Sequence, residues 1–172
     1  LSVSAIGADR PGIVAGVTGV LVEHGCNLED TSMTILRGHF AMTMVVDSPV
    51  PGDVLAGALE PVADRLGLVV DVREIAPAAA QPRSGRPHVV SVHGADHPGI
   101  VHAVAATLAK RGVNVTDLTT HLVGEPEPLY VMTLDVDVPA DVDEADLAAD
   151  LRSTAESLGV TATLHAVDAD LL

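Results

Sequence analysis

The chain has 172 residues, 48% of them hydrophobic, so it can bury a core with only one Phe, one Tyr and no Trp. Nine Lys and Arg oppose 24 Asp and Glu, which gives a formal net charge of −15. Such a charge repels phosphate backbones and anionic lipid surfaces, so we expect neither direct DNA binding nor membrane attachment. Because no basic start leads into an apolar stretch and no apolar run approaches the ~20 residues of a bilayer span, we expect a cytoplasmic protein.

The first predicted elements are a strand and a helix. The apolar residues 1–6 predict the strand. We expect Asp9 or Arg10 to cap the helix and Pro11 to occupy its first position, where a missing N–H is tolerated. Apolar residues then follow helical spacing until Gly25, a residue type favoured just after a helix.

A hairpin, a second helix and a last strand follow. Residues 28–36 and 39–47 predict the hairpin strands, the second with one apolar face formed by Phe40, Met42, Met44 and Val46. The second helix is expected over residues 53–66, with a kink or a split at Pro61. A strand over residues 68–75 closes this half of the chain.

The same order recurs in the second half. The sequence DRPGIV at residues 9–14 returns 87 positions later as DHPGIV at residues 96–101. Here strands are expected at residues 88–93 and 160–167, with a regular second helix ending at Gly159. A six-residue motif that recurs in this way, within the same order of predicted elements, indicates an internal repeat.

The repeat predicts an α+β protein with two tandem ferredoxin-like βαββαβ domains. Each has an antiparallel four-stranded sheet with two helices on one face. We place the first domain at residues 1–76, a Pro/Ala-rich linker at 77–86 and the second domain at 87–172. Exposed sheet faces and edges need cover, so we also expect a homodimer or mutual cover by the two copies.

These motifs resemble the ACT domain, in both copies and over nearly the whole chain outside the linker. The tandem layout is most similar to the family of glycine cleavage system transcriptional repressors, and single ACT domains of formyltetrahydrofolate deformylase and phosphoserine phosphatase share much of the pattern. ACT domains bind amino acids at this turn and at a following Asn, usually where two domains meet. The resemblance implies that the ligand-binding residues are Asp9, Arg10, Gly12, Ile13, Asn27, Asp96, His97, Gly99, Ile100 and Asn114.

The residue types at the first turn agree with that implication. The N-terminus of a helix carries partial positive charge and favours a carboxylate. Gly12 allows close approach to the backbone, Asp9 could accept an ammonium group, and Asn27 offers both a donor and an acceptor. The sequence therefore indicates a site for a zwitterionic amino acid.

Purely structural roles remain open for the same residues. Asp9 and Asp96 could cap helices, Gly12 and Gly99 could serve tight packing, and Asn27 and Asn114 could hold turns. Because His97 replaces Arg10, we expect the two sites to differ, and one copy could be purely structural.

Other candidate sites carry weaker signals. His93, His97 and His102 are close in sequence but fall on a strand, a turn and a helix, so we expect no metal site. Cys26 has no obvious base and cannot form an internal disulfide. Asp168 and Asp170 faintly resemble a phosphatase loop, but we expect no catalytic domain to follow them.

The favoured hypothesis is a regulatory protein that is not an enzyme and has no cofactor. It would sense a small amino acid such as glycine or serine and act through contact with a protein partner, in regulation of glycine cleavage or one-carbon metabolism. The alternatives are a small hydrolase or deformylase-like enzyme, or a detached regulatory subunit of a separate enzyme.

Overall fold

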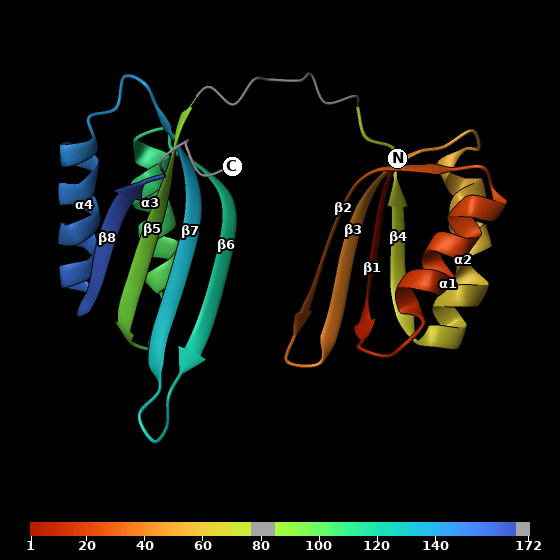
Figure 1. Ribbon diagram of the computed structural model, residues 1–172, viewed down its shortest axis with the longest axis horizontal. Coiled ribbons are helices and arrows are strands. Elements are labelled where there is room, and N and C mark those ends of the chain that lie inside the picture. Colours follow the sequence, from red (N-terminus) through yellow and green to blue (C-terminus); the bar gives the residue numbers. More distant parts are fainter. Residues whose placement is uncertain (77–84, 168–172) are drawn as a thin grey trace. The chain divides into compact units, whose positions relative to one another are not determined.

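The computed structural model describes residues 1–76 and 85–167, and the chain divides into two compact units, Leu1–Ala79 and Ala80–Leu172. Each unit has its own sheet and its own hydrophobic core (Figure 1). Residues 77–84, which form most of the predicted linker, lie outside the described residues. None of the helices in the described ranges is long and apolar enough to cross a membrane.

The first domain has the predicted order of elements: β1 (Ser2–Ala8), α1 (Ile13–Glu23), β2 (Asn27–Leu36), β3 (His39–Asp47), α2 (Gly52–Leu66) and β4 (Leu68–Arg73). Its antiparallel sheet has the strand order β2-β3-β1-β4. Figure 1 shows α1 and α2 on one face of this sheet. The predicted ferredoxin-like arrangement is confirmed.

The second domain repeats this plan with β5 (Gly85–Ala95), α3 (Ile100–Lys110), β6 (Asn114–Val123), β7 (Leu129–Pro139), α4 (Glu144–Ser157) and β8 (Val160–Ala166). Its strand order, β6-β7-β5-β8, matches that of the first domain. Both domains bury apolar residues at the predicted spacing, every second residue on β3 and every fourth on α1 and α3, as in Ile13, Val17, Leu21, Ile100, Val104 and Leu108.

The start of each first helix differs from the prediction. The N-cap of α1 is Gly12 rather than Asp9 or Arg10, so Pro11 lies outside the helix. The reason is that Gly12 has a left-handed conformation, with φ of 93°, which turns the chain just before the helix. Gly99 has the same role at α3, with φ of 102°.

Two further details differ from the sequence analysis. The helix α2 continues from Gly52 to Leu66 through Pro61, so it is not split there. The strand β5 begins at Gly85, inside the segment taken as linker. Gly85 pairs with Pro139, and a Cβ at Gly85 would lie 2.8 Å from the backbone carbon of Asp137, so this glycine serves a close strand contact.

Candidate functional site

The turn between β1 and α1 borders an open hollow of about 490 Å³. Its lining residues come from the turn, the first residues of α1 and strands β2 and β3: Asp9, Arg10, Pro11, Gly12, Ile13, Val14, Ala15, Met33 and Phe40. The first bond of the helix runs from the Gly16 N–H to the Gly12 carbonyl oxygen at 2.8 Å, and no side chain caps the N-terminus. The earlier N–H groups of Ile13, Val14 and Ala15 therefore have no partner in the helix.

The turn between β5 and α3 borders a matching hollow of about 480 Å³. It is lined by Asp96, His97, Pro98, Gly99, Ile100, Val101, His102 and Tyr130. The first bond of α3 runs from the Ala103 N–H to the Gly99 carbonyl oxygen at 3.0 Å, and this helix also has no side-chain cap. The two copies of the repeated sequence motif therefore border equivalent hollows, one in each domain.

Two of the structural alternatives for these turn residues are wrong. Neither Asp9 nor Asp96 caps its helix. A Cβ added at Gly12 or Gly99 would meet nothing within 4 Å, so tight packing does not explain these glycines. Their positive φ explains them, because side chains other than glycine rarely adopt it.

Arg10 and His97 contact equivalent places in their domains. The Arg10 guanidinium lies beside Gly67, the C-cap of α2, at 3.5 Å from the point a Cβ would occupy. The His97 ring makes its Nε2 contact with the carbonyl oxygen of Leu158, the C-cap of α4, at 2.7 Å. The His97 ring thus links its turn to the C-terminal end of α4, and Arg10 lies at the corresponding end of α2.

Asn27 and Asn114 do not join the turn residues of their own domain. Asn27 pairs with Asp47 at the end of β3, whereas Ala8, just before the turn, pairs with His39 at its start. These two ends of β3 lie about 27 Å apart at ~3.4 Å per residue. A small ligand at Asp9 therefore cannot also contact Asn27 of the same domain, and the register of Asn114 with Asp137 repeats this arrangement.

The strands supply residues that the sequence analysis missed. Phe40 of β3 and Tyr130 of β7 hold equivalent positions in the two hollows, and Met33 of β2 lines only the first. The pKa of Tyr130 is raised, mainly by burial and to a smaller extent by the negative charge of Asp96. Its hydroxyl donates to the Met132 sulfur at 3.7 Å. Strand alternation marked Phe40 as apolar and inward, but only the sheet register brings it to the turn.

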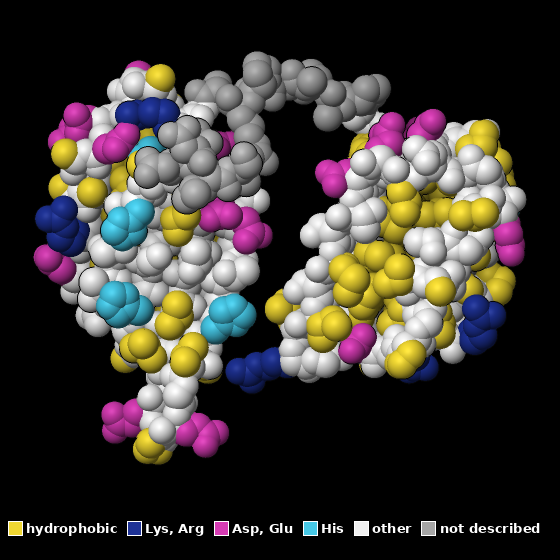
Figure 2. Space-filling view, viewed as in Figure 1, with side chains coloured by type: hydrophobic (Ala, Val, Ile, Leu, Met, Phe, Trp, Pro, Cys, Tyr) yellow, Lys and Arg dark blue, Asp and Glu magenta, His cyan; other side chains and the backbone are white. Residues whose placement is uncertain are grey.

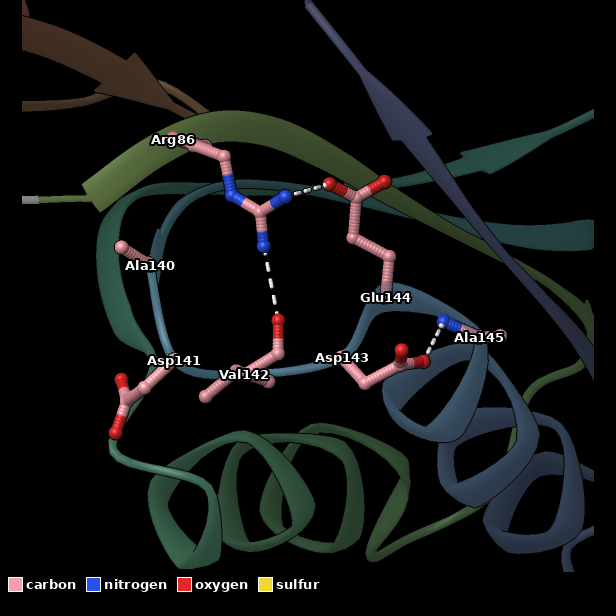
Figure 3. A pocket seen from close by; sticks show the side chains of 7 residues that line it. All are labelled: Arg86, Ala140, Asp141, Val142, Asp143, Glu144 and Ala145. Carbon is pink, nitrogen blue, oxygen red and sulfur yellow. Dashed lines mark hydrogen bonds and ion pairs between the residues drawn. The ribbon is translucent and has the colours of Figure 1, made fainter.

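A different hollow, of about 420 Å³, lies at the N-terminus of α4 and is lined by Arg86, Ala140, Asp141, Val142, Asp143, Glu144 and Ala145 (Figure 3). The guanidinium of Arg86 pairs with Glu144 Oε1 and donates to the Val142 carbonyl oxygen at 2.8 Å. Asp143 Oδ1 accepts from the N–H groups of Ala145 and Asp146, so it caps the helix. Arg86, Glu144 and Asp143 thus already have partners within the protein around this hollow.

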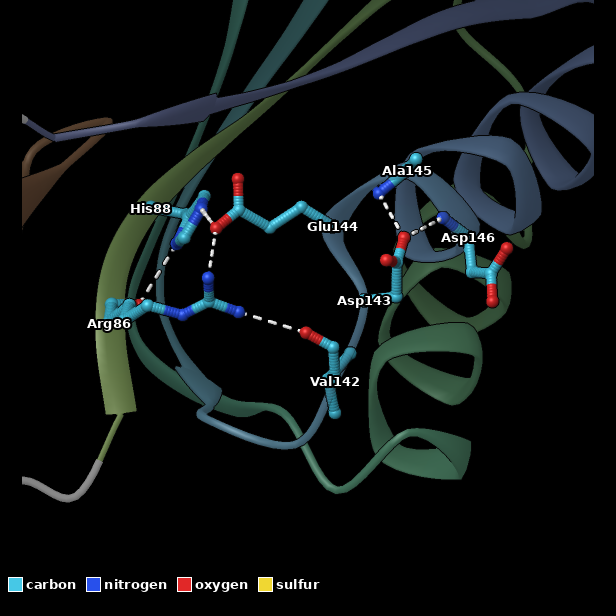
Figure 4. Close-up of polar contacts among 7 residues, drawn as sticks. All are labelled: Arg86, His88, Val142, Asp143, Glu144, Ala145 and Asp146. Atoms are coloured by element: carbon cyan, nitrogen blue, oxygen red, sulfur yellow. Dashed lines mark hydrogen bonds and ion pairs between the residues drawn. The ribbon is translucent and has the colours of Figure 1, made fainter.

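The buried His88 joins this cluster from β5. Its Nε2 lies 3.4 Å from Glu144 Oε1, and its Nδ1 lies 2.9 Å from the Arg86 carbonyl oxygen (Figure 4). His88 is 2% exposed and is buried beneath Arg86 and Glu144, which are about half exposed. We interpret the cluster as a clamp that fixes the start of β5 to α4.

The weaker candidates gain no support. Within residues 1–76 and 85–167, no group of three or more His, Cys, Asp and Glu side chains is placed to hold a metal ion. The histidines that Figure 2 shows on the second domain are well separated. Cys26 is partly exposed and contacts the Ser48 hydroxyl at 3.4 Å. Asp168 and Asp170 lie outside the described residues.

Comparisons with known proteins agree with this architecture. A UPF0237 protein from Methanopyrus kandleri is 53% identical over 72 residues, which cover 41% of this chain and 79% of the relative. The glycine cleavage system transcriptional repressor of Escherichia coli is 25% identical over 174 residues, covering 98% of this chain and 90% of the relative. A crystal structure of a Galdieria sulphuraria protein described as unknown superposes with a TM-score of 0.80 at 30% identity, covering 97% of both chains.

The family models match each half separately. ACT domain models match residues 1–73 and residues 88–154. These ranges contain the two turns and their hollows. The chain therefore belongs to the ACT-domain family and carries two ACT domains in tandem.

Proposed function

We propose that the chain is a regulatory protein that binds a small amino acid, with glycine and serine as the first candidates, at the turns that open α1 and α3. The observation that carries this proposal is the repetition of one hollow in both domains, each with a carboxylate at its rim and an uncapped helix N-terminus. The ligand carboxylate would accept from the free backbone N–H groups, and its ammonium would bind Asp9 or Asp96.

Asn27 would complete the site from a second copy of the chain. Among the described residues, β2 is an edge strand with one unpaired side, and antiparallel pairing of two β2 strands would bring Asn27 of one copy near Leu36 of the other. Leu36 precedes the hairpin tip, where Gly38 accepts a hydrogen bond from the Asp9 N–H at 2.8 Å. A homodimer of this kind would place Asn27 beside the other copy's turn.

The regulatory output would be made by protein contact. The Escherichia coli relative is named as a transcriptional repressor and resembles this chain over nearly its whole length. A net charge of −15 opposes DNA binding, so we infer a protein partner whose binding depends on the ligand state. Fluorescence anisotropy with duplex DNA at low salt tests this, and tight binding that weakens steeply with salt contradicts it.

Calorimetric titration of the full chain with glycine and with serine tests the binding proposal. Asp9→Asn and Asp96→Asn should each weaken binding at one domain by about 1–3 kcal/mol, because the ligand ammonium loses its charged partner. Glu60→Gln is the matched control, since Glu60 is an exposed carboxylate on α2 that does not line the hollow. Absence of binding at millimolar ligand, or an equal loss in the control, contradicts the proposal.

A further inference from the structure

His97 occupies the position that Arg10 holds in the first domain, and both of its ring nitrogens are engaged. Nε2 lies 2.7 Å from the Leu158 carbonyl oxygen, and Nδ1 lies 3.1 Å from the Pro98 carbonyl oxygen. Both partners are carbonyl oxygens, which only accept hydrogen bonds. A neutral imidazole has one N–H and can satisfy only one of them, whereas an imidazolium satisfies both.

The surroundings of His97 also favour its charged form. The Pro98 and Leu158 carbonyls, in that order, raise the pKa of His97 above its ordinary 6.5, and Asp96 adds to the effect. The ring lies at the C-terminus of α4, the negative end of the helix dipole, and the last turn of that helix carries Glu156 and no basic residue. The opposing groups are His102 and the N-terminus of α3 in the same hollow, which also holds Tyr130.

We propose that protonated His97 is a positioning residue that holds the turn 96–99 against α4 and so makes amino-acid binding by the second ACT domain depend on pH. Arg10, which lies at the corresponding end of α2, keeps its charge at every physiological pH, because a guanidinium does not lose its proton there. The ligand class is an amino acid whose carboxylate binds at the α3 N-terminus beside the imidazolium. The part of this inference that concerns binding rests on the proposed function.

The sign of the pH dependence follows from the raised pKa of His97 in the folded state. The tie between the turn and α4 is complete below 6.5, the ordinary pKa of histidine, and is lost as pH rises through the higher pKa of the folded protein. Ligand binding at the second domain should therefore weaken between about pH 6 and pH 8, while binding at the first domain should not.

The positioning role can be tested without any ligand. NMR of the full chain, with the His97 signals assigned by their loss in His97→Arg, should show both ring nitrogens protonated at pH 6 and a titration midpoint above 6.5. Amide exchange protection at Ala103, whose N–H donates to the Gly99 carbonyl oxygen of the turn, should fall several-fold in His97→Gln relative to His97→Arg at pH 6. A midpoint at or below 6.5, or equal protection in the two variants, overturns the proposal.

Exchanging the two basic residues tests the link to binding. With glycine and serine as probes, the wild-type chain should lose about tenfold in affinity at one site between pH 6 and pH 8. His97→Arg should abolish that loss, and Arg10→His should add a similar loss at the first domain. A pH dependence that survives in His97→Arg overturns the link, whereas failure of both probes to bind contradicts the proposed function and leaves the NMR arm to decide the role of His97.

Discussion

The same corner of the ACT fold is built differently in the two domains. In the first domain, Leu1 packs into the core, and its Cδ2 atom lies 3.4 Å from the point where a Cβ on Gly52, the first residue of α2, would lie. In the second domain the equivalent residues are His88 and Glu144, joined by Arg86. One backbone position thus accepts either an apolar contact or a polar cluster, in which buried His88 Nε2 faces Glu144 at 3.4 Å without forming a hydrogen bond.

The cluster of Arg86, His88 and Glu144 also fixes the start of β5. Arg86 is the second residue of β5 and bonds to both Glu144 and the Val142 carbonyl oxygen, so the start of the second domain is held at α4. In the first domain, Leu1 is held by its apolar contacts and by backbone hydrogen bonds with Val46 of β3, rather than by side-chain bonds to α2. The two corners should therefore respond differently to substitution.

The largest expected effect is the loss of Glu144. Glu144→Ala removes the carboxylate that faces buried His88 and pairs with Arg86, and should destabilise the second domain by about 1–3 kcal/mol. Gly52→Ala is the matched change in the first domain and should alter stability by less than ~0.5 kcal/mol, because its Cβ would make an ordinary contact with Leu1. Urea unfolding followed by domain-resolved NMR measures both, and equal effects would contradict the comparison.

The double variant His88→Leu with Glu144→Gly sharpens this comparison, because it copies the first domain's corner. It should recover most of the stability that Glu144→Ala loses, since no buried polar group is left without a partner. A double variant as unstable as Glu144→Ala would mean that the two corners differ in more than these residues.

A second prediction concerns what the domains share. Gly12→Ala and Gly99→Ala should each destabilise their domain by about 1–2 kcal/mol, because the added Cβ has room but the left-handed backbone is strained. The two losses should be equal within error in thermal unfolding. A large loss in only one domain would show that packing, rather than backbone conformation, sets the requirement at that turn.

The fold was predictable from the sequence because its signals are local and repeated. Alternation on β3 and the four-residue spacing on α1 identify the core faces, and the repeated DRPGIV and DHPGIV motifs identify both turns. The helix start was missed because a proline is usual at a first helical position, whereas the left-handed φ of Gly12 cannot be read from its residue type alone.

The candidate site was predictable only in part, because its lining is not local. Phe40, Met33 and Tyr130 reach the hollows through sheet register, which depends on how separate strands pair. Register also separates Asn27 from Asp9, since α1 carries the chain back along the sheet between them. The His88 cluster was missed because Gly85 and Arg86 have the composition of a linker.

The smallest expected effect concerns the two helix N-termini beside these corners. Asp143 caps α4 by accepting from Ala145 N–H at 2.8 Å and from Asp146 N–H at 3.1 Å, so Asp143→Ala should cost about 1 kcal/mol.

Pro51, the N-cap of α2, makes no such bond and already has an extended backbone, with φ of −61° and ψ of 154°. Pro51→Asp should therefore stabilise the first domain by up to about 0.5 kcal/mol, the gain from a new cap less the flexibility that proline loss restores to the unfolded chain. Denaturant midpoints for each domain measure both changes, with Pro51→Ala as the control that removes proline without adding a cap. If Pro51→Asp is no more stable than Pro51→Ala, capping does not distinguish the two helices.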